Sequence, residues 1–195
     1  MMFQTLSEHY DHLDELLARR PKEVFISTFG LYAGITHEGI DYASRFHSPT
    51  RHFLDNLKQC PSVKIMVGVP EYISCSKDNR CKNCEHKYLH YMVRLLNHVE
   101  TYPEFKWRMK LQFHIKCFLF FYDGQVAGVA GGRNLTDSGY EDVTFPIDAK
   151  LCKDFLKSSM AGWKAAMVAN ESAVETILKS QRIKADIVDG EVQIL

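Results

Sequence analysis

The chain has 195 residues, and its 24 Lys and Arg residues balance 24 Asp and Glu residues, so the formal net charge is zero. This balance excludes a protein that coats nucleic acid through bulk positive charge, because counterion release needs a basic surface, although a local basic patch remains compatible with it. The composition, 46% hydrophobic and 25% charged, is typical of a globular protein, and the length suits one domain with a full core. We therefore expect a single domain over residues 1–195.

No segment predicts export or membrane insertion. No apolar run approaches the roughly 20 residues that a membrane-spanning helix requires. The first 20 residues carry four acidic side chains among their apolar ones, which is unlike a secretory signal. We therefore expect a cytoplasmic protein, in which the six cysteines are thiols or metal ligands rather than disulfides.

The first part of the chain alternates between helix and strand. Apolar residues at helical spacing predict a helix over residues 4–20, which Pro21 ends. The β-branched and aromatic segment 23–32 predicts a buried strand, and after a loop a serine followed by proline opens a helix over 48–58. Residues 63–69 then predict a second strand.

The second part begins with a polar, cysteine-rich loop over residues 71–90 and ends with a helical tail over residues 148–195. Between them the pattern predicts a helix over 87–101 and strands within 106–121, 125–130 and 141–147. The tail opens with an amphipathic helix over 148–170, followed by a short helix and a hairpin around Asp189-Gly190. This order predicts an α/β fold, a sandwich of helices around a mixed sheet.

Two polar residues interrupt an apolar strand. His114 and Lys116 are two positions apart, so the strand period places both on one face, while Phe113, Ile115 and Cys117 point into a core on the other. Burying unpaired polar groups is costly, and an active-site cleft is one reason to keep them there.

A glycine-rich turn follows the next strand. The turn, Gly131-Gly132-Arg133-Asn134, allows the backbone to approach a ligand closely and could bring Asn134 near the two polar residues. An imidazole can attack phosphorus, and lysine and asparagine can hold the non-bridging oxygens, so the set suits phosphoryl chemistry.

These residues resemble the signature of the phospholipase D superfamily, H-x-K followed by G-[GS]-x-N. The resemblance covers roughly residues 20–150, since both early strands, the H-x-K strand, the glycine turn and an acidic pair fall in the family's order. It implies a phospholipase D-like α-β-α sandwich with His114 as the nucleophile and Lys116 and Asn134 binding phosphate. Glu141 or Asp142 would orient the histidine, and the chemistry would need no metal.

The chain departs from the family pattern in three ways. Phe121 stands where the family usually has an aspartate, and Asp123 follows two positions later in a turn. The spacing of 20 residues from His114 to Asn134 is longer than the commonest one, which a longer hairpin explains. Gly132 replaces a frequent serine, which removes one possible hydroxyl contact to phosphate.

The chain carries one H-x-K motif, whereas the mechanism uses one histidine as nucleophile and a second as general acid. Short relatives with one motif pair two chains around a two-fold axis. We therefore expect a homodimer in which His114 of both chains shares one composite site.

The cysteine-rich loop has the spacing of a metal site. Zinc takes four sulfur or nitrogen ligands, and Cys75, Cys81, Cys84 and His86 could supply them, with His90 one helical turn further as an alternative to His86. Such a zinc would be structural, because four protein ligands leave no open position. The alternatives are reduced thiols in a loop or a redox pair formed by Cys81 and Cys84.

Local charge favours nucleic acid as the substrate. Residues 77–110 hold eight Lys and Arg residues against four acidic ones, a local excess of four positive charges. No amphipathic segment combines a basic face with exposed aromatic residues, so we expect no stable membrane association. The leading hypothesis is a metal-independent phosphodiesterase, specifically a nuclease. The alternatives are a non-catalytic module of the same fold that binds nucleic acid, a nucleotide or a partner protein, and a lipid phosphodiesterase.

Overall fold

The computed structural model describes residues 2, 5–32, 35–36, 39–40, 48–69, 82–136, 143–180, 185–188 and 191–194. Within these ranges, the side chains of residues 32, 35–36, 39–40, 82–88, 90, 185–188 and 191–194 are not described.

A seven-stranded mixed sheet forms the centre of the fold, with the strand order β10-β8-β7-β1-β5-β6-β11. Strands β1, β5 and β6 run parallel to one another, whereas β7, β8, β10 and β11 each pair antiparallel with a neighbour. Their bounds are β1 Glu23–Thr28, β5 Val63–Val69, β6 Lys106–Leu111, β7 Cys117–Phe121, β8 Val126–Gly131, β10 Thr144–Ile147 and β11 Met167–Val168. The mixed sheet confirms the predicted α/β class.

Three small pairs lie outside this sheet. β2 and β9 pair in parallel, and β3 with β4 and β12 with β13 form antiparallel pairs. Their bounds are β2 Leu31–Tyr32, β9 Leu135–Thr136, β3 Ile35–Thr36, β4 Gly39–Ile40, β12 Ala185–Val188 and β13 Glu191–Ile194. The last pair is the hairpin predicted in the tail.

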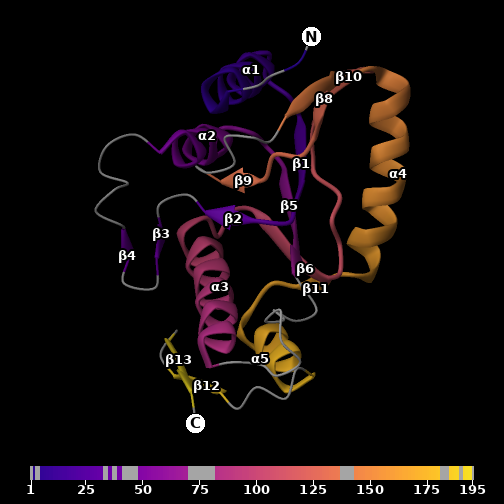
Figure 1. The fold of residues 1–195 in the computed structure, drawn as a ribbon. Helices are drawn as coiled ribbons and strands as arrows, with labels where there is room; N and C mark the ends of the chain where they lie inside the picture. The colour runs from indigo at the N-terminus through magenta and orange to yellow at the C-terminus, as the bar shows by residue number, and fades with distance from the viewer. Residues whose placement is uncertain are drawn as a thin grey trace.

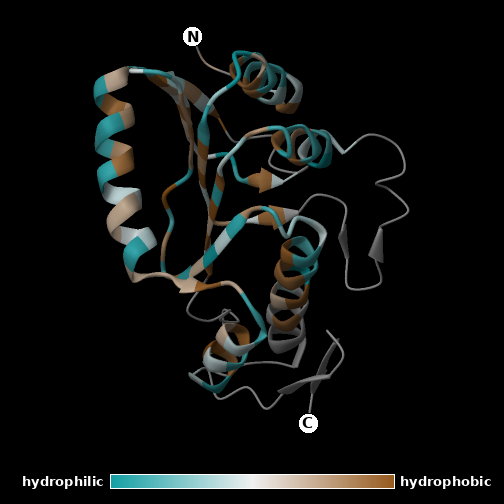
Figure 2. Ribbon diagram, turned by 180° about the vertical axis from the view of Figure 1, so that it is seen from behind, coloured by the Kyte–Doolittle hydropathy of each residue, from teal (hydrophilic) through white to brown (hydrophobic). Residues whose placement is uncertain are grey.

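Helices cover both faces of the sheet (Figure 1). Seen edge-on, the sheet stands between α1, α2 and α3 on one side and α4 alone on the other, and α5 lies beyond the β11 edge. The helix bounds are α1 Leu6–Ala18, α2 Pro49–Leu57, α3 Lys82–Thr101, α4 Ala149–Ala165 and α5 Glu171–Ser180. Hydrophilic and hydrophobic residues alternate along α4 (Figure 2), as expected for a helix that covers one sheet face.

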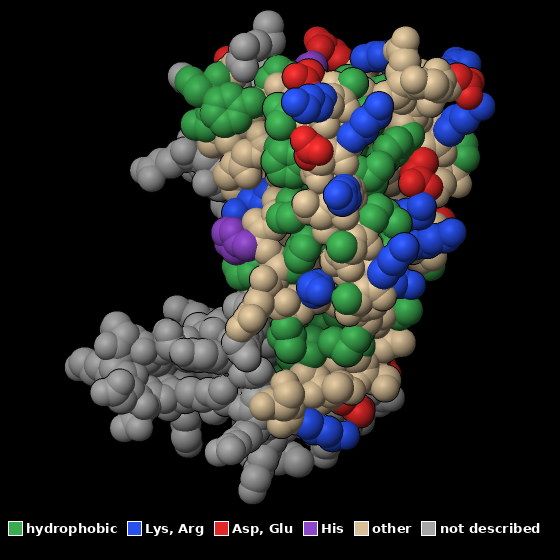
Figure 3. Space-filling model, turned by 90° about the vertical axis from the view of Figure 1, so that its right-hand side faces the viewer, with side chains coloured by type: hydrophobic (Ala, Val, Ile, Leu, Met, Phe, Trp, Pro, Cys, Tyr) green, Lys and Arg blue, Asp and Glu red, His purple; other side chains and the backbone are tan. Residues whose placement is uncertain are grey.

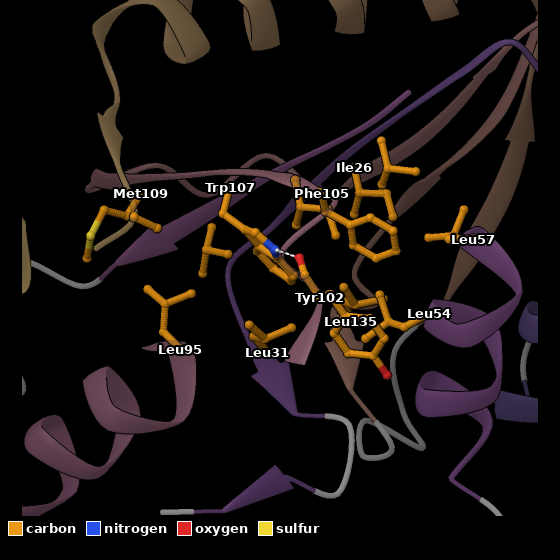
Figure 4. Close-up of a cluster of buried hydrophobic side chains, with 14 of the residues drawn as sticks. Ile26, Leu31, Leu54, Leu57, Leu95, Tyr102, Phe105, Trp107, Met109 and Leu135 are labelled. Atoms are coloured by element: carbon orange, nitrogen blue, oxygen red, sulfur yellow. Dashed lines mark hydrogen bonds between the residues drawn. The ribbon is translucent and has the colours of Figure 1, made fainter. Parts of the chain in front are cut away.

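The sheet separates two hydrophobic clusters. The larger one packs β-strand residues such as Ile26 and Phe118 against α1, α2, α3 and α5. In its centre the Trp107 indole N–H donates to the Tyr102 carbonyl at 3.0 Å (Figure 4). The smaller one lies under α4 and includes Phe25, Met66 and Cys117. Strand residues therefore alternate between the two clusters, which is why the central strands are apolar on both faces.

Local signals set the helix starts. Thr5 and Glu8 form a capping box at α1, Ser48 caps α2 before Pro49, and Asp148 caps α4. The amphipathic helix predicted over 148–170 ends earlier, at Ala165, because the chain turns extended and adds β11 to the sheet edge. The helix predicted over 87–101 begins earlier, at Lys82.

The strand predicted over 23–32 is broken into β1 and β2. The backbone N–H groups of Phe29 and Gly30 donate to the side chain of Asn134, at 3.0 and 2.9 Å. These donors therefore bind a side-chain acceptor at the point where a continuous strand was expected. The strand predicted over 141–147 begins at Thr144, and residues 141–142 lie outside the described part of the chain.

Candidate active site

The candidate residues lie at one edge of the sheet. The parallel strands β1, β5 and β6 end at this edge, β7 starts there, and β8 ends there. The His114 segment connects β6 to β7, and Asn134 follows β8. The carboxyl ends of parallel strands are where open α/β sheets bind ligands.

Residues 113–116 do not belong to a strand, which corrects the expectation that His114 and Lys116 lie within one. Gln112 has a φ of 57°, in the left-handed region, and turns the chain at the end of β6. β7 then starts at Cys117. The predicted segment therefore holds two strands, and the polar pair lies in the connection between them, where His114 is exposed and Lys116 half-buried.

The apolar residues of this connection anchor it from behind. Phe113 and Ile115 pack against the cluster under α4, as the alternation predicted. Ser27 Oγ donates to the Ile115 carbonyl at 2.7 Å. Gly68 in β5 lies so close to the Phe113 carbonyl that a Cβ at position 68 would overlap the carbonyl oxygen. The backbone around His114 is therefore fixed by two neighbouring strands.

His114 and Lys116 are in contact. The Lys116 Nζ lies 3.3 Å from His114 Nδ1, and the imidazole packs on the Phe29 ring with centroids 4.3 Å apart. A lysine ammonium is only a donor, so Nδ1 accepts in this arrangement. The contact places the two polar groups on one side of the chain, and the Phe29 ring supports the imidazole from a second element.

Asn134 is oriented by the end of β1. Its Oδ1 accepts from two backbone N–H groups, those of Phe29 and Gly30, and this fixes which side of the amide is oxygen. The Nδ2 donor makes no hydrogen bond to another residue in the described ranges. Thr28 completes the turn, since its hydroxyl donates to the Gly30 carbonyl at 2.6 Å and accepts from the Leu135 N–H at 2.9 Å.

Phe29 is therefore the residue that joins the predicted set. Its ring contacts the His114 imidazole, and its N–H binds the Asn134 amide. A Cβ on the neighbouring Gly30 would come within 3.2 Å of the Asn134 side chain, so a residue without a side chain suits this approach.

Tyr91 is a residue of the site that the sequence did not indicate. It extends from α3, and its hydroxyl lies 2.8 Å from the Phe29 carbonyl and 3.1 Å from the Gly68 carbonyl. It thus joins the ends of β1 and β5 behind the site. No pattern in the sequence indicates this role, because the two acceptors are backbone atoms of distant strands.

A buried polar group lies beside the site. Arg133, next to Asn134, is fully buried, and its positive charge acts on His9 of α1. Burial, together with the Arg133 charge, lowers the pKa of His9 to about 3, so this imidazole is neutral at physiological pH. Its Nδ1 lies 3.0 Å from the Thr144 hydroxyl.

Phe121 and Asp123, two of the residues that depart from the family pattern, lie away from His114. Phe121 ends β7 at the opposite edge of the sheet and packs against the cluster under α4. Asp123 pairs with Lys22 in the exposed turn beyond it. Neither position faces the candidate site.

The other predicted catalytic residues and the predicted zinc ligands fall mostly outside the described residues. Glu141, Asp142, Cys75 and Cys81 lie there, and Cys84 and His86 belong to α3 without described side chains. Among the side chains that the structure describes, no three His, Cys, Asp or Glu residues gather as a metal site would require. All predicted zinc ligands, including the alternative His90, therefore lie outside the described side chains.

The other three cysteines of the chain lie in described segments. Cys117 and Cys152 are buried, Cys60 is half-buried, and all three are free thiols. Burial raises the pKa of Cys117 and of Cys152 to about 11, so both are protonated at neutral pH and are poor nucleophiles.

No known family profile and no curated protein matches the sequence. Solved structures do match the fold. The chain is similar to NucT from Helicobacter pylori, with 13% identity over 86% of this chain and 97% of that one and a TM-score of 0.48. It is also similar to phosphatidylserine synthase from Haemophilus influenzae Rd KW20, with 16% identity over 96% of this chain and 37% of that one and a TM-score of 0.49.

A third match is TrmBL2, described as an archaeal chromatin protein with a novel mode of DNA binding, with 10% identity, coverage of 86% of this chain and 53% of that one, and a TM-score of 0.49. The chain thus spans about half of TrmBL2 and little more than a third of the synthase. NucT and the synthase are members of the phospholipase D superfamily, whose signature the sequence resembles. These matches concern the fold and do not identify an activity.

The helices give no sign of a membrane span: none in the described part of the chain has the length and hydropathy to cross a bilayer.

Proposed function

We propose that this protein is a metal-independent phosphodiesterase, specifically a nuclease, which works through a phosphohistidine intermediate. One observation carries the proposal: Phe29 holds an exposed imidazole with an adjacent ammonium, and an asparagine amide whose Nδ2 makes no bond to another described residue. A nucleophile next to two donors for non-bridging oxygens is the equipment that phosphoryl transfer requires.

In the first step, His114 Nε2 attacks the phosphorus of a bound diester. A phosphorus–nitrogen bond forms, the phosphorus–oxygen bond to the leaving group breaks, and the leaving oxygen takes a proton. Lys116 and the Asn134 Nδ2 donate to the non-bridging oxygens, whose charge increases as the nucleophile approaches. In the second step, water attacks the phosphohistidine, releases a phosphate monoester and restores the imidazole.

Attack through Nε2 requires the ring proton on Nδ1. In the structure Nδ1 faces the Lys116 ammonium, which cannot accept a proton. A bound phosphate would draw Lys116 towards its oxygens, and a carboxylate would then accept a hydrogen bond from the Nδ1–H group, which keeps its proton. Glu141 or Asp142 fills this orienting role in the proposal.

The leaving oxygen needs a general acid, and the proposal assigns this role to His114 of a second copy in a homodimer. The exposure of His114 supports it, since the side chain is open to a partner surface. In the second step the same imidazole takes the proton from the attacking water, so protons balance over the cycle. The proposed zinc, held by Cys75, Cys81, Cys84 and His86 or His90, would shape the loop and take no part in these steps.

The test is cleavage of labelled single- and double-stranded DNA and RNA in the presence of EDTA. We expect cleavage by the wild-type protein, its loss in His114→Ala, and its retention in His12→Ala, which removes a histidine paired with Glu15 on α1. Native mass spectrometry of the same samples reports the dimer and any bound zinc. Cleavage by His114→Ala at the wild-type rate would refute the assignment.

Two further outcomes would favour one of the alternative functions and leave the fold assignment unaffected. Tight binding of nucleic acid without turnover would support the non-catalytic module. Hydrolysis of phospholipid vesicles in preference to nucleic acid would support a lipid phosphodiesterase.

A further inference from the structure

Strand β6 presents a row of positive charges on one face. Trp107 and Met109 point into the larger core, so the alternate residues Lys106, Arg108 and Lys110 lie on the α4 face of the sheet. No acidic residue occurs between Glu104 and Asp123 in the sequence. The row therefore has no acidic neighbour along its own strand or the one that follows.

Among the described residues, no acidic side chain neutralises the positive charges of this row. The Arg108 guanidinium donates to the Trp163 carbonyl and lies 4.9 Å from the centre of the Trp163 ring, so its position is fixed without loss of charge. Lys64, beside Lys106 on β5, pairs with Glu23 at 2.6 Å. Neither Lys106 nor Lys110 pairs with an acidic side chain in the ranges described.

The row begins at a hollow in the surface. A pocket of about 460 Å³ is lined by Lys106 and Arg108 and by the apolar side chains of Val99 and Val168. Charged groups beside an apolar wall suit a nucleotide, whose phosphate meets the cations while its sugar and base meet the wall. Val168 is 57% exposed, so the wall is accessible from solvent.

The row ends beside the connection between β6 and β7 that carries His114. Lys110 pairs with Gly68 across the sheet, and Gly68 lies against the carbonyl of Phe113, the residue before His114. Alternate residues of a strand are roughly 6.6–6.8 Å apart, so Lys106 and Lys110 are separated by about 13 Å. The step of about 6.7 Å between neighbouring cations of the row is close to the distance between successive phosphates along an extended nucleic-acid strand, so Lys106 and Lys110 are about two phosphates apart.

We propose that Lys106, Arg108 and Lys110 form a phosphate track that guides single-stranded nucleic acid from the pocket to His114. This inference rests on the proposed function and names its substrate class. A single row of cations matches one backbone, whereas a duplex presents two. The face that carries α4 shows basic and acidic side chains interspersed (Figure 3), and the net charge of zero likewise provides no broad basic surface for a duplex.

The test measures binding in a His114→Asn background, so that cleavage does not interfere. Fluorescence anisotropy with a labelled 20-nucleotide single strand is followed over a salt series for Lys106→Gln/Lys110→Gln. Each lost phosphate contact lowers the salt slope by about 0.7, so two contacts lower it by about 1.4, which corresponds to roughly 25-fold weaker binding at 0.1 M salt. The matched control is Lys153→Gln/Lys157→Gln, which removes two exposed lysines of α4 and should leave the slope unchanged.

Three results would overturn the track: an unchanged slope in Lys106→Gln/Lys110→Gln, an equal loss in the α4 control, or tighter binding of a duplex than of the single strand. Hydrolysis of bis(p-nitrophenyl) phosphate by the protein with His114 intact is the separate test of the proposed function. If the protein does not hydrolyse the diester but its binding of the single strand still depends on Lys106 and Lys110, only the proposed enzymatic activity is refuted. If the protein hydrolyses the diester but its binding of the single strand does not depend on Lys106 and Lys110, only the phosphate track is refuted.

Discussion

Removing the Tyr91 hydroxyl should loosen the candidate site without dismantling the fold. In the structure this hydroxyl joins the ends of β1 and β5 through the carbonyls of Phe29 and Gly68. Phe29 in turn contacts both His114 and Asn134. The Tyr91→Phe variant keeps the ring and its packing and deletes only the donor.

The expected magnitude follows from the number of donors. A hydroxyl has one proton, so the two carbonyls at 2.8 and 3.1 Å share a single hydrogen bond rather than receiving two. Its loss should lower the free energy of unfolding by about 1–2 kcal/mol, since the Gly68 carbonyl belongs to a buried residue. A displaced Phe29 should lower kcat for a phosphodiester by about tenfold, because small shifts of a reacting group are costly, while KM changes less.

Tyr122→Phe is the matched control. Its hydroxyl donates to the Leu16 carbonyl at 2.7 Å, and neither residue contacts Phe29, His114 or Asn134 in the contacts given above. Removing this hydroxyl should lower the free energy of unfolding by about 1 kcal/mol and leave kcat unchanged. Urea unfolding gives the stability, and steady-state kinetics give kcat and KM. The proton NMR signals of His114 add a readout independent of activity, because the Phe29 ring lies 4.3 Å from the imidazole and shifts them.

The positioning role of Tyr91 would be refuted if both variants lost similar stability and both kept the wild-type kcat and His114 signals. In that case the hydroxyl would stabilise the fold alone, and Phe29 would hold the two polar residues without it.

Three further changes test other parts of the structure. The lowered pKa of His9, about 3 in the folded chain against 6.5 when unfolded, makes the unfolded state bind more protons below pH 6.5, so unfolding free energy should fall by about 2 kcal/mol from pH 7 to pH 5. His9→Gln should flatten this difference in urea unfolding at the two pH values, and an unchanged slope would contradict the assignment. Gly68→Ala should destabilise by roughly 1–3 kcal/mol and impair cleavage, because its methyl group displaces the Phe113 carbonyl; wild-type melting and activity would argue against this contact. Asn134→Asp keeps the acceptor for the backbone N–H groups and replaces the Nδ2 donor by a second oxygen, so thermal melting should change little while phosphodiester cleavage falls by about 100-fold or more; full activity would rule out phosphate binding by this side chain.

Several features of the fold were predicted because their signals are local. The serine cap at Ser48 and the proline after it mark the start of α2, and the strand predicted over 63–69 matches β5, Val63–Val69. The alternation around His114 correctly placed Phe113 and Ile115 towards a core. Such signals depend only on residues that are close in the sequence, so they can be recognised without the tertiary structure.

The break between β1 and β2 shows what local patterns leave open. Residues 23–32 are rich in β-branched and aromatic side chains and predict one continuous strand. The break accompanies hydrogen bonds between Phe29 or Gly30 and Asn134, residues more than a hundred positions further along. The turn at Gln112, which removes His114 from the predicted strand, is likewise invisible in the residue pattern.

The sequence by itself determined the class of fold, the starts of α1, α2 and α4 to within about two residues, and the residue types of the candidate site. The chemistry of His114, Lys116 and Asn134, and their resemblance to the signature of a known superfamily, pointed to this site. The tertiary structure decided how they are held: Phe29 between imidazole and amide, Tyr91 behind it, and the cationic row of β6 leading to the same edge. Each of these arrangements joins backbone or side-chain atoms of strands that are adjacent only after the sheet has formed, so no local pattern could specify them.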